Sequence, residues 1–277
     1  MDSKLLAQIR ILSSDQILPF EWPQSPEHSL DVDLNSLTMV RHPFLVSPLE
    51  AEGYLLLCDT GYYRALSEGG LGHFPVQVCH PDEVSLVTER LGLDTFTAAD
   101  LSRLAAKYPD QIAINDADPD RLPPLGFLPI QFRFANSVRL AAYFRHSGKV
   151  GCPPSLEHLF RAITQRGRYL AALDLPSDDD SLTRLATITG TMQLPSFSLD
   201  DLGKAALAER HFPPGIVRVS CRRRMLDIDF PMGVLASPIP ASEKEAFFRD
   251  LVTVRCQNRR TAVYEGQVYL LNQQMFS

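Results

Sequence analysis

The segment from Cys58 to Arg64 combines groups that could bind an anion. It reads Cys-Asp-Thr-Gly-Tyr-Tyr-Arg and follows an apolar run that predicts a strand. Helical spacing of apolar residues begins at Tyr62, and either Asp59 or Thr60 can serve as the N-cap. A helix that opens after a glycine-bearing turn presents free backbone N–H groups on its positive dipole end. The segment therefore predicts an anion site, and the alternative is a tight turn with nothing bound.

A second candidate group is Glu21, in the loop Pro19-Phe20-Glu21-Trp22-Pro23. The prolines stiffen this backbone, and the aromatic neighbours would desolvate the glutamate if the loop packed on the body of the protein. Desolvation moves a carboxyl pKa towards the range of a general base. The alternative is a solvated glutamate beside an anchoring tryptophan, and the sequence alone favours that alternative.

A short run of elements over residues 41–78 must position the anion site. Apolar runs at 44–46 and 54–58 predict two strands, and the polar, glycine-bearing stretch 50–53 predicts a hairpin turn between them. A helix over 62–71 and one further strand complete the run. Arg41 and His42 come just before the first strand and could face the same cleft. His42 is given little weight as a site residue, because lone histidines are more often structural.

The rest of the chain predicts further elements. Thr97 and Ser198 each begin a helix, with an aspartate three residues on that completes a capping box. The stretch from 109 to 130, rich in proline and aspartate, predicts a long connection and a domain boundary. Strand-like residues close the chain as a predicted hairpin with Glu265-Gly266 in its turn.

Composition and net charge indicate a globular protein and weigh against general binding to nucleic acid. The chain has 277 residues, 45% hydrophobic and 22% charged, which is the balance of a globular protein. A net charge of −6 gives no overall attraction to nucleic acid, so DNA binding would need a local basic patch. Arg222-Arg223-Arg224 is the candidate patch, but strand alternation would place Arg223 on the opposite face from its two neighbours.

Cysteine usage and hydropathy give an expected location. The five cysteines include no Cys-x-x-Cys pair, so neither a zinc site nor a disulfide framework is indicated. The first residues are too polar for a signal peptide, and no apolar run approaches membrane-spanning length. We therefore expect a cytoplasmic protein without a membrane partner. The oligomeric state does not follow from the sequence.

These segments resemble the ParB/sulfiredoxin-like fold, and within it the free L-serine kinases associated with staphyloferrin B siderophore biosynthesis. The central likeness lies in three segments: 41–46, 54–59 with the short helix after it, and 75–78. Asp15-Gln16-Ile17 before Glu21 is similar to the stretch before the family's catalytic glutamate. Pro213-Pro214-Gly215-Ile216-Val217-Arg218 is similar to a Pro-x-Gly-x-Thr-Arg stretch of the family, and residues 265–272 also look similar.

The resemblance implies an α+β fold in three parts. A ParB/sulfiredoxin-like domain would cover 1–92, a helical and proline-rich connection 93–150, and a mixed α/β C-terminal domain 151–277. The implied activity is phosphoryl transfer from a nucleotide to the hydroxyl of free L-serine, giving O-phospho-L-serine for 2,3-diaminopropionate synthesis. ATP is favoured over ADP as the donor, and Mg²⁺ is the expected metal.

The resemblance also implies residue roles. Glu21 would be the base, and Asp59 would hold Mg²⁺ or orient the hydroxyl, with a plain N-cap as an equally weighted alternative. Arg218 would pair with the serine carboxylate, whereas its alternative is a strand arginine paired with an aspartate. An exposed helix position is the alternative for Arg64. Nucleotide phosphates would be bound by the residues that open the helix and its first turn: Thr60, Gly61, Tyr62 and Arg64.

Two departures from the family keep a second class of function open. The family carries Asp-Gly-x-His-Arg at the turn, whereas this chain has one extra residue between Asp59 and Arg64 and no histidine. Val217 stands where the family has threonine. A lost imidazole removes one donor to a transferring phosphoryl group. The alternative is therefore a non-catalytic ParB-like regulator, or a nucleotide- or DNA-binding protein, with nucleic acid the less favoured partner.

Overall fold

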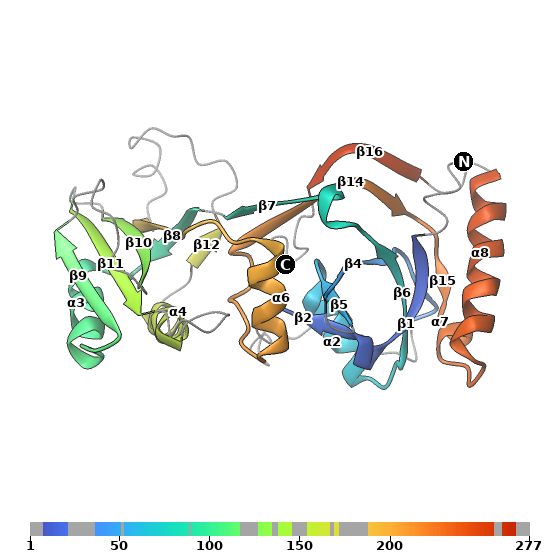
Figure 1. The fold of residues 1–277 in the computed structure, drawn as a ribbon, viewed down its shortest axis with the longest axis horizontal. Coiled ribbons are helices and arrows are strands. Elements are labelled where there is room, and N and C mark those ends of the chain that lie inside the picture. The colour runs from blue at the N-terminus through green and yellow to red at the C-terminus, as the bar shows by residue number, and fades with distance from the viewer. Residues whose placement is uncertain are drawn as a thin grey trace. The chain divides into compact units, whose positions relative to one another are not determined.

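The computed structural model describes residues 8–21, 37–50, 53–88, 90–116, 127–134, 138–145, 154–166, 169–171, 188–257 and 262–269 (Figure 1). The chain divides into two compact units, one of residues 1–86 with 219–277 and one of 87–218. The predicted division at 92 and 150 differs from this, because the C-terminal segment joins the N-terminal residues in one core. Phe230 and Phe248 share that core with Ile11.

The first unit is built on a mixed five-stranded sheet with the order β1-β6-β4-β5-β2. The strands are β1 (Ile9–Ser13), β2 (Ile17–Pro19), β4 (Phe44–Pro48), β5 (Tyr54–Leu56) and β6 (His73–Val78). β4 and β5 form the predicted antiparallel hairpin, whereas β2 pairs with β5, and β4 with β6, in parallel. Two 3-10 turns complete this region, Ser14–Gln16 and Pro81–Glu83.

Helix α2 (Thr60–Glu68) connects β5 to β6. Tyr63 and Leu66, three residues apart on one face, are both buried in the core. The ring of Tyr63 meets that of Phe44 on β4 edge-to-face. The strand, turn, helix and strand predicted for 41–78 are therefore confirmed, with the helix beginning two residues earlier than expected.

The C-terminal part of the first unit adds β14 (Val217–Leu226), β15 (Phe230–Pro231), α7 (Met232–Leu235), α8 (Ala241–Gln257) and β16 (Ala262–Tyr269). β14 lies between β16 and β7 (Val84–Thr88), and β15 pairs with β3 (Met39–Val40). The predicted closing hairpin is wrong. Glu265 pairs with Arg223 in the antiparallel ladder of β14 and β16, so hydrogen bonds to β14 hold Glu265-Gly266 in an extended strand.

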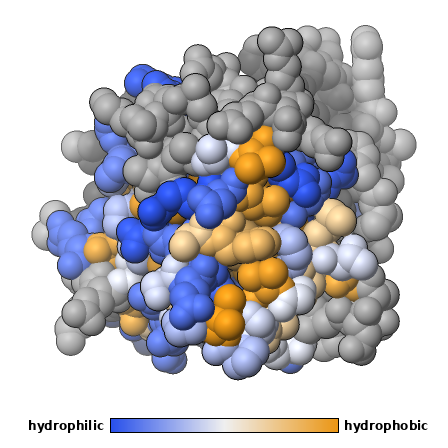
Figure 2. Space-filling model, turned by 90° about the vertical axis from the view of Figure 1, so that its right-hand side faces the viewer, coloured by the Kyte–Doolittle hydropathy of each residue, from blue (hydrophilic) through white to orange (hydrophobic). Residues whose placement is uncertain are grey.

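Helix α8 carries apolar side chains on two sides. Phe248 and Val252 are buried in the core of the first unit, whereas Phe247 and Val254 are exposed. Figure 2 views the side on which α8 lies and shows apolar side chains set among hydrophilic ones. No helix in the described part of the chain is both long and apolar enough to cross a membrane.

The second unit contains a six-stranded sheet with the order β12-β8-β13-β10-β11-β9. The strands are β8 (Arg90–Asp94), β9 (Ile112–Asp116), β10 (Phe127–Phe134), β11 (Arg139–Arg145), β12 (Tyr169–Ala171) and β13 (Ile188–Gln193). Its helices are α3 (Ala98–Lys107), α4 (Pro154–Arg166) and α6 (Leu199–Leu207), and the capping boxes predicted at Thr97 and Ser198 are confirmed.

The prediction of a helical and proline-rich connection over 93–150 is wrong, because β9, β10 and β11 lie within that range. Pro129 is tolerated in β10 because the pairing of β10 with β13 starts only at Gln131. In the described residues, Pro129 lies opposite Tyr143 of β11 and opposite no residue of β13. That end of β10 therefore behaves as an edge, where a missing N–H costs little. Trp22 and residues 270–272 lie outside the described residues.

Candidate functional site

Asp59 forms the turn between β5 and α2. Its φ of 56° is left-handed, a conformation that aspartate tolerates better than most side chains. Its backbone carbonyl accepts the N–H of Tyr63 at 2.9 Å and so starts the helix. Asp59 occupies the predicted N-cap position, but its side chain makes no capping hydrogen bond. Instead, Oδ2 lies 3.3 Å from Nη2 of Arg224 on β14.

Arg224 is held in place through its own backbone neighbours. The buried amide of Gln77 on β6 donates to the carbonyl of Arg223 at 2.8 Å and accepts the N–H of Met225 at 3.0 Å. The ladder of β14 and β16 shifts register between Cys221 and Arg223. Arg222 is exposed, while the side chain of Arg224, two residues on, is only 10% exposed. The three arginines do not form one basic patch.

Glu21 is buried, with 8% of its surface exposed, so the solvated-loop hypothesis is wrong. Its backbone carbonyl accepts a hydrogen bond from Nη2 of Arg64 at 3.0 Å. This contact places Glu21 against the first turns of α2. Burial lowers the pKa of Arg64, while the charges of Glu68 and Glu21 raise it. The structure therefore brings Glu21 to the helix start that carries Asp59 and Arg64, although 43 positions separate Glu21 from Arg64.

Three buried polar atoms near this helix start have no hydrogen-bond partner among the described residues. They are Thr60 Oγ1, Arg64 Nε and Arg224 Nε. Thr60 is only 3% exposed. Buried polar groups are almost always paired, so such a group calls for an explanation. The first amides of α2 also lack acceptors within the helix, because the first i to i−4 bond is made by Tyr63. An anion with several oxygens would satisfy donors of all these kinds.

The two tyrosines of α2 differ in their surroundings. Tyr63 donates its hydroxyl to the carbonyl of Ser14 at 3.0 Å, and burial raises its pKa to about 12. Tyr62 is half-buried and stacks on Phe44 with 5.8 Å between ring centroids. Burial and the charge of Asp59 raise the pKa of Tyr62. Tyr63 is thus committed to the core, whereas Tyr62 lies near Asp59. Gly61, between Thr60 and Tyr62, is partly exposed.

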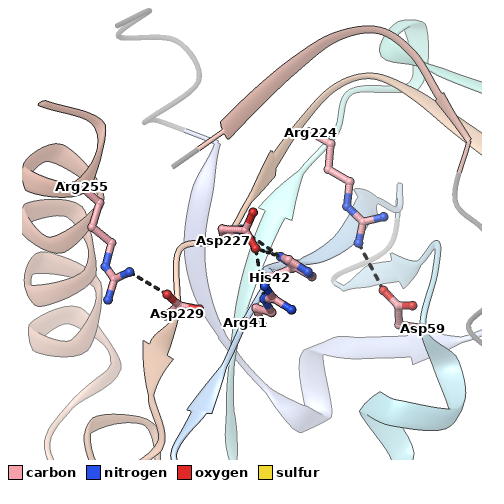
Figure 3. A network of polar contacts seen from close by, with 7 residues as sticks. All are labelled: Arg41, His42, Asp59, Arg224, Asp227, Asp229 and Arg255. Carbon is pink, nitrogen blue, oxygen red and sulfur yellow. Dashed lines mark hydrogen bonds and ion pairs between the residues drawn. The ribbon is translucent and has the colours of Figure 1, made fainter. Parts of the chain in front are cut away.

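Figure 3 shows the Asp59–Arg224 pair together with two further aspartate–arginine pairs among the described residues of the first unit. Arg41 Nε lies 3.1 Å from Asp227 Oδ1, and Arg255 Nη1 lies 2.7 Å from Asp229 Oδ2. All three aspartates have positive φ. Each therefore shapes a left-handed turn while its carboxylate holds an arginine from another segment.

Arg218 lies in β14 and is assigned to the second unit. It is partly exposed, and its role towards a carboxylate stays a prediction. For Mg²⁺, Asp59 is the candidate ligand, with 26% of its side chain exposed. No cluster of three or more metal-binding side chains occurs in the described residues. One carboxylate still fits Mg²⁺, which commonly keeps waters and binds nucleotide phosphates alongside one or two carboxylates.

The sequence did not single out Arg224 or Gln77 as members of the site. Its pattern places Arg224 in a candidate basic patch with Arg222 and Arg223, and a glutamine in an apolar strand gives no sign of its role. One signal in the sequence could have indicated Gln77. It is a polar residue inside an otherwise apolar strand, Phe74-Pro75-Val76-Gln77-Val78.

Solved structures resemble this chain in fold. SbnI with a C-terminal truncation, from Staphylococcus aureus, matches with a TM-score of 0.70 and 15% identity, over 92% of this chain and 100% of that chain. A free serine kinase mutant in complex with ADP matches with a TM-score of 0.61 and 11% identity, over 82% of this chain and 94% of that chain. A complex of a free serine kinase mutant with AMP matches with a TM-score of 0.62 and 12% identity, over 82% of this chain and 93% of that chain.

No family model and no curated protein matches the sequence. Identities of 11% to 15% show a shared fold and no more. The chain is thus a mixed α and β protein with the architecture of SbnI and of a free serine kinase.

Proposed function

We propose that this protein is a free L-serine kinase of the ParB/sulfiredoxin-like fold, which transfers a phosphoryl group from a nucleotide to the serine hydroxyl. The observation that carries the proposal is the placement of buried Glu21 against Arg64, at a helix start where Thr60, Arg64 and Arg224 hold unpaired buried donors. A base and a set of phosphate donors side by side are what phosphoryl transfer requires.

The roles follow from the chemistry of each group. The serine oxygen attacks phosphorus, the bond from phosphorus to the nucleotide's bridging oxygen breaks, and Glu21 takes the hydroxyl proton. Thr60, Gly61 and Tyr62 offer backbone amides to the phosphate oxygens, and Arg64 and Arg224 offer guanidinium donors. Arg218 is proposed to pair with the serine carboxylate.

Asp59 would hold Mg²⁺ through a carboxylate oxygen. When bound there, the metal would neutralise part of the charge on the nucleotide phosphates. The pairing with Arg224 keeps the carboxylate oriented at the helix start.

Two nucleotides, ATP and ADP, are candidates for the phosphoryl donor. ATP is the donor expected from the family resemblance, while the similar kinase structures are complexes with ADP and with AMP. ADP and AMP differ by one phosphoryl group, as a donor and its product would. ADP is therefore the first alternative donor. The pathway proposed for the product, O-phospho-L-serine, is the supply of 2,3-diaminopropionate for siderophore synthesis, and the cytoplasmic location stays a prediction.

The test is an incubation of the protein with L-serine, Mg²⁺ and either ATP or ADP, followed by mass spectrometry for phosphoserine. Glu21→Gln should abolish the product while nucleotide binding remains. Glu50→Gln is the matched control, since Glu50 is an exposed glutamate in the turn after β4. Absence of phosphoserine with both nucleotides would refute the kinase proposal.

A non-catalytic regulator that binds a nucleotide is the second candidate. The observation that favours it is the departure from the family motif between Asp59 and Arg64, together with Val217. Nucleotide binding without phosphoserine formation would support this candidate. The split of Arg222 and Arg224 between exposed and buried environments weighs against nucleic acid as the partner.

A further inference from the structure

His42, in the loop between β3 and β4, is held from one side. The backbone N–H of Asp227 donates to its Nδ1 at 2.9 Å. A ring nitrogen that accepts a hydrogen bond carries no proton, so the neutral imidazole carries its proton on Nε2. His42 makes no other hydrogen bond within the described part of the chain, and 28% of its side chain is exposed. Its Nε2–H is therefore a donor available to a ligand.

The backbone around His42 is fixed by the turn after β14. The carbonyl of Arg41 accepts the N–H groups of Ile228 and Asp229 at 3.0 and 3.1 Å. Asp227 and Asp229 both have φ near +55°, in a turn that aspartate tolerates. With the side-chain pair of Arg41 and Asp227 added, these contacts hold the imidazole in one orientation.

The imidazole lies beside the phosphate-binding groups. In Figure 3 its ring lies between Asp227 on one side and the pair of Arg224 and Asp59 on the other. Burial and the charge of Arg224 lower the pKa of His42, and the charge of Asp227 acts in the opposite direction. A neutral ring in this position donates one hydrogen bond, and Nε2 is the nitrogen on the side away from the Asp227 amide.

We propose that His42 is a catalytic residue of the site, and that its Nε2–H donates a hydrogen bond to an oxygen of the transferring phosphoryl group. This inference rests on the proposed function, because it names a further contact to the same phosphoryl group. An imidazole from the loop before β4 would thereby supply the donor that the turn between Asp59 and Arg64 lacks. A donor aimed at the charge that develops in the transition state acts on kcat.

Two substitutions separate this role from a structural one. His42→Asn keeps an acceptor near Nδ1 for the Asp227 amide but removes the Nε2 donor. His42→Gln places an amide near the Nε2 position and loses the Nδ1 acceptor. The catalytic role predicts that His42→Asn lowers kcat by about 10²-fold, with unchanged serine KM and an unchanged thermal midpoint. His42→Gln should keep more of kcat and have the lower midpoint.

The opposite ranking, with normal kcat in His42→Asn and losses confined to His42→Gln, would overturn the inference and leave the kinase proposal intact. Nitrogen NMR of the imidazole gives a readout that needs no turnover. Adding ADP, or ATP, to the wild-type protein should shift the Nε2 resonance of His42. A shift without phosphoserine formation would support the contact and refute the kinase. No shift at saturating nucleotide would refute the contact, whatever the turnover.

Discussion

The guanidinium of Arg224 and the carboxylate of Asp59 lie 3.3 Å apart, although 165 positions separate them in the chain. The turn that opens α2 is therefore completed by a strand from the far end of the sequence. Because Gln77 fixes the backbone on both sides of Arg224, the pair joins β6, β14 and the start of α2.

Replacing Arg224 by methionine should lower both stability and nucleotide affinity. It removes a charged hydrogen bond to a partly buried carboxylate, an interaction worth roughly 1–3 kcal/mol. Urea unfolding and calorimetric titration with ATP or ADP measure the two effects. Arg222→Met is the matched control, because Arg222 is its exposed neighbour two residues away and should change neither quantity. Equal effects of the two variants would contradict the assigned role.

Replacing Thr60 by valine should raise stability while weakening nucleotide binding. The buried Oγ1 has no partner in the described residues, so exchanging the hydroxyl for a methyl group removes a desolvation cost of about 1–3 kcal/mol. Thr189→Val provides the contrast, since that hydroxyl donates to the carbonyls of Leu93 and Phe96 and its loss should destabilise the protein. If Thr60→Val loses stability and binds nucleotide normally, the hydroxyl has no ligand role.

The free energy of unfolding should fall as the pH drops from about 7 to about 5. The pKa of His42 is lowered in the folded protein, mainly by burial and then by Arg224, from an ordinary value of 6.5. The unfolded chain then binds more protons than the folded one below that value, so stability present at neutral pH is lost on acidification. His73, whose pKa is lowered by burial and by Lys244, contributes in the same direction.

Chemical unfolding at a series of pH values tests this dependence. His42→Asn and His73→Asn should each flatten the slope, and the double variant should flatten it further. An unchanged slope in the double variant would show that these imidazoles are not the groups that titrate.

Replacing Tyr63 by phenylalanine should destabilise the protein without affecting turnover. It deletes the hydrogen bond to the Ser14 carbonyl, worth roughly 0.5–1.5 kcal/mol, and keeps the ring in the core. Tyr62→Phe is the companion, because it keeps the stack on Phe44 and tests the hydroxyl near Asp59. Thermal unfolding and the phosphoserine assay measure both variants; a drop in turnover for Tyr63→Phe would place that hydroxyl in the chemistry.

Local sequence patterns were enough to predict the elements that depend on neighbours along the chain. The capping boxes at Thr97 and Ser198 join groups three residues apart, and the strand, turn and helix around Asp59 follow from local hydrophobic spacing. The placement of Glu21, Asp59 and Arg64 in one site followed from likeness to a family, and the structure brings these residues together.

The distant groups that complete the site are known only from the folded chain. Arg224 is buried beside Asp59 while Arg222, two residues away, is exposed, and His42 is oriented by an amide 185 positions away. Residues 112–116, 127–134 and 262–269 form strands because a partner strand pairs with each of them, against the local preferences of proline and glycine. Contacts of this kind depend on sheet order and register, which local spacing does not encode.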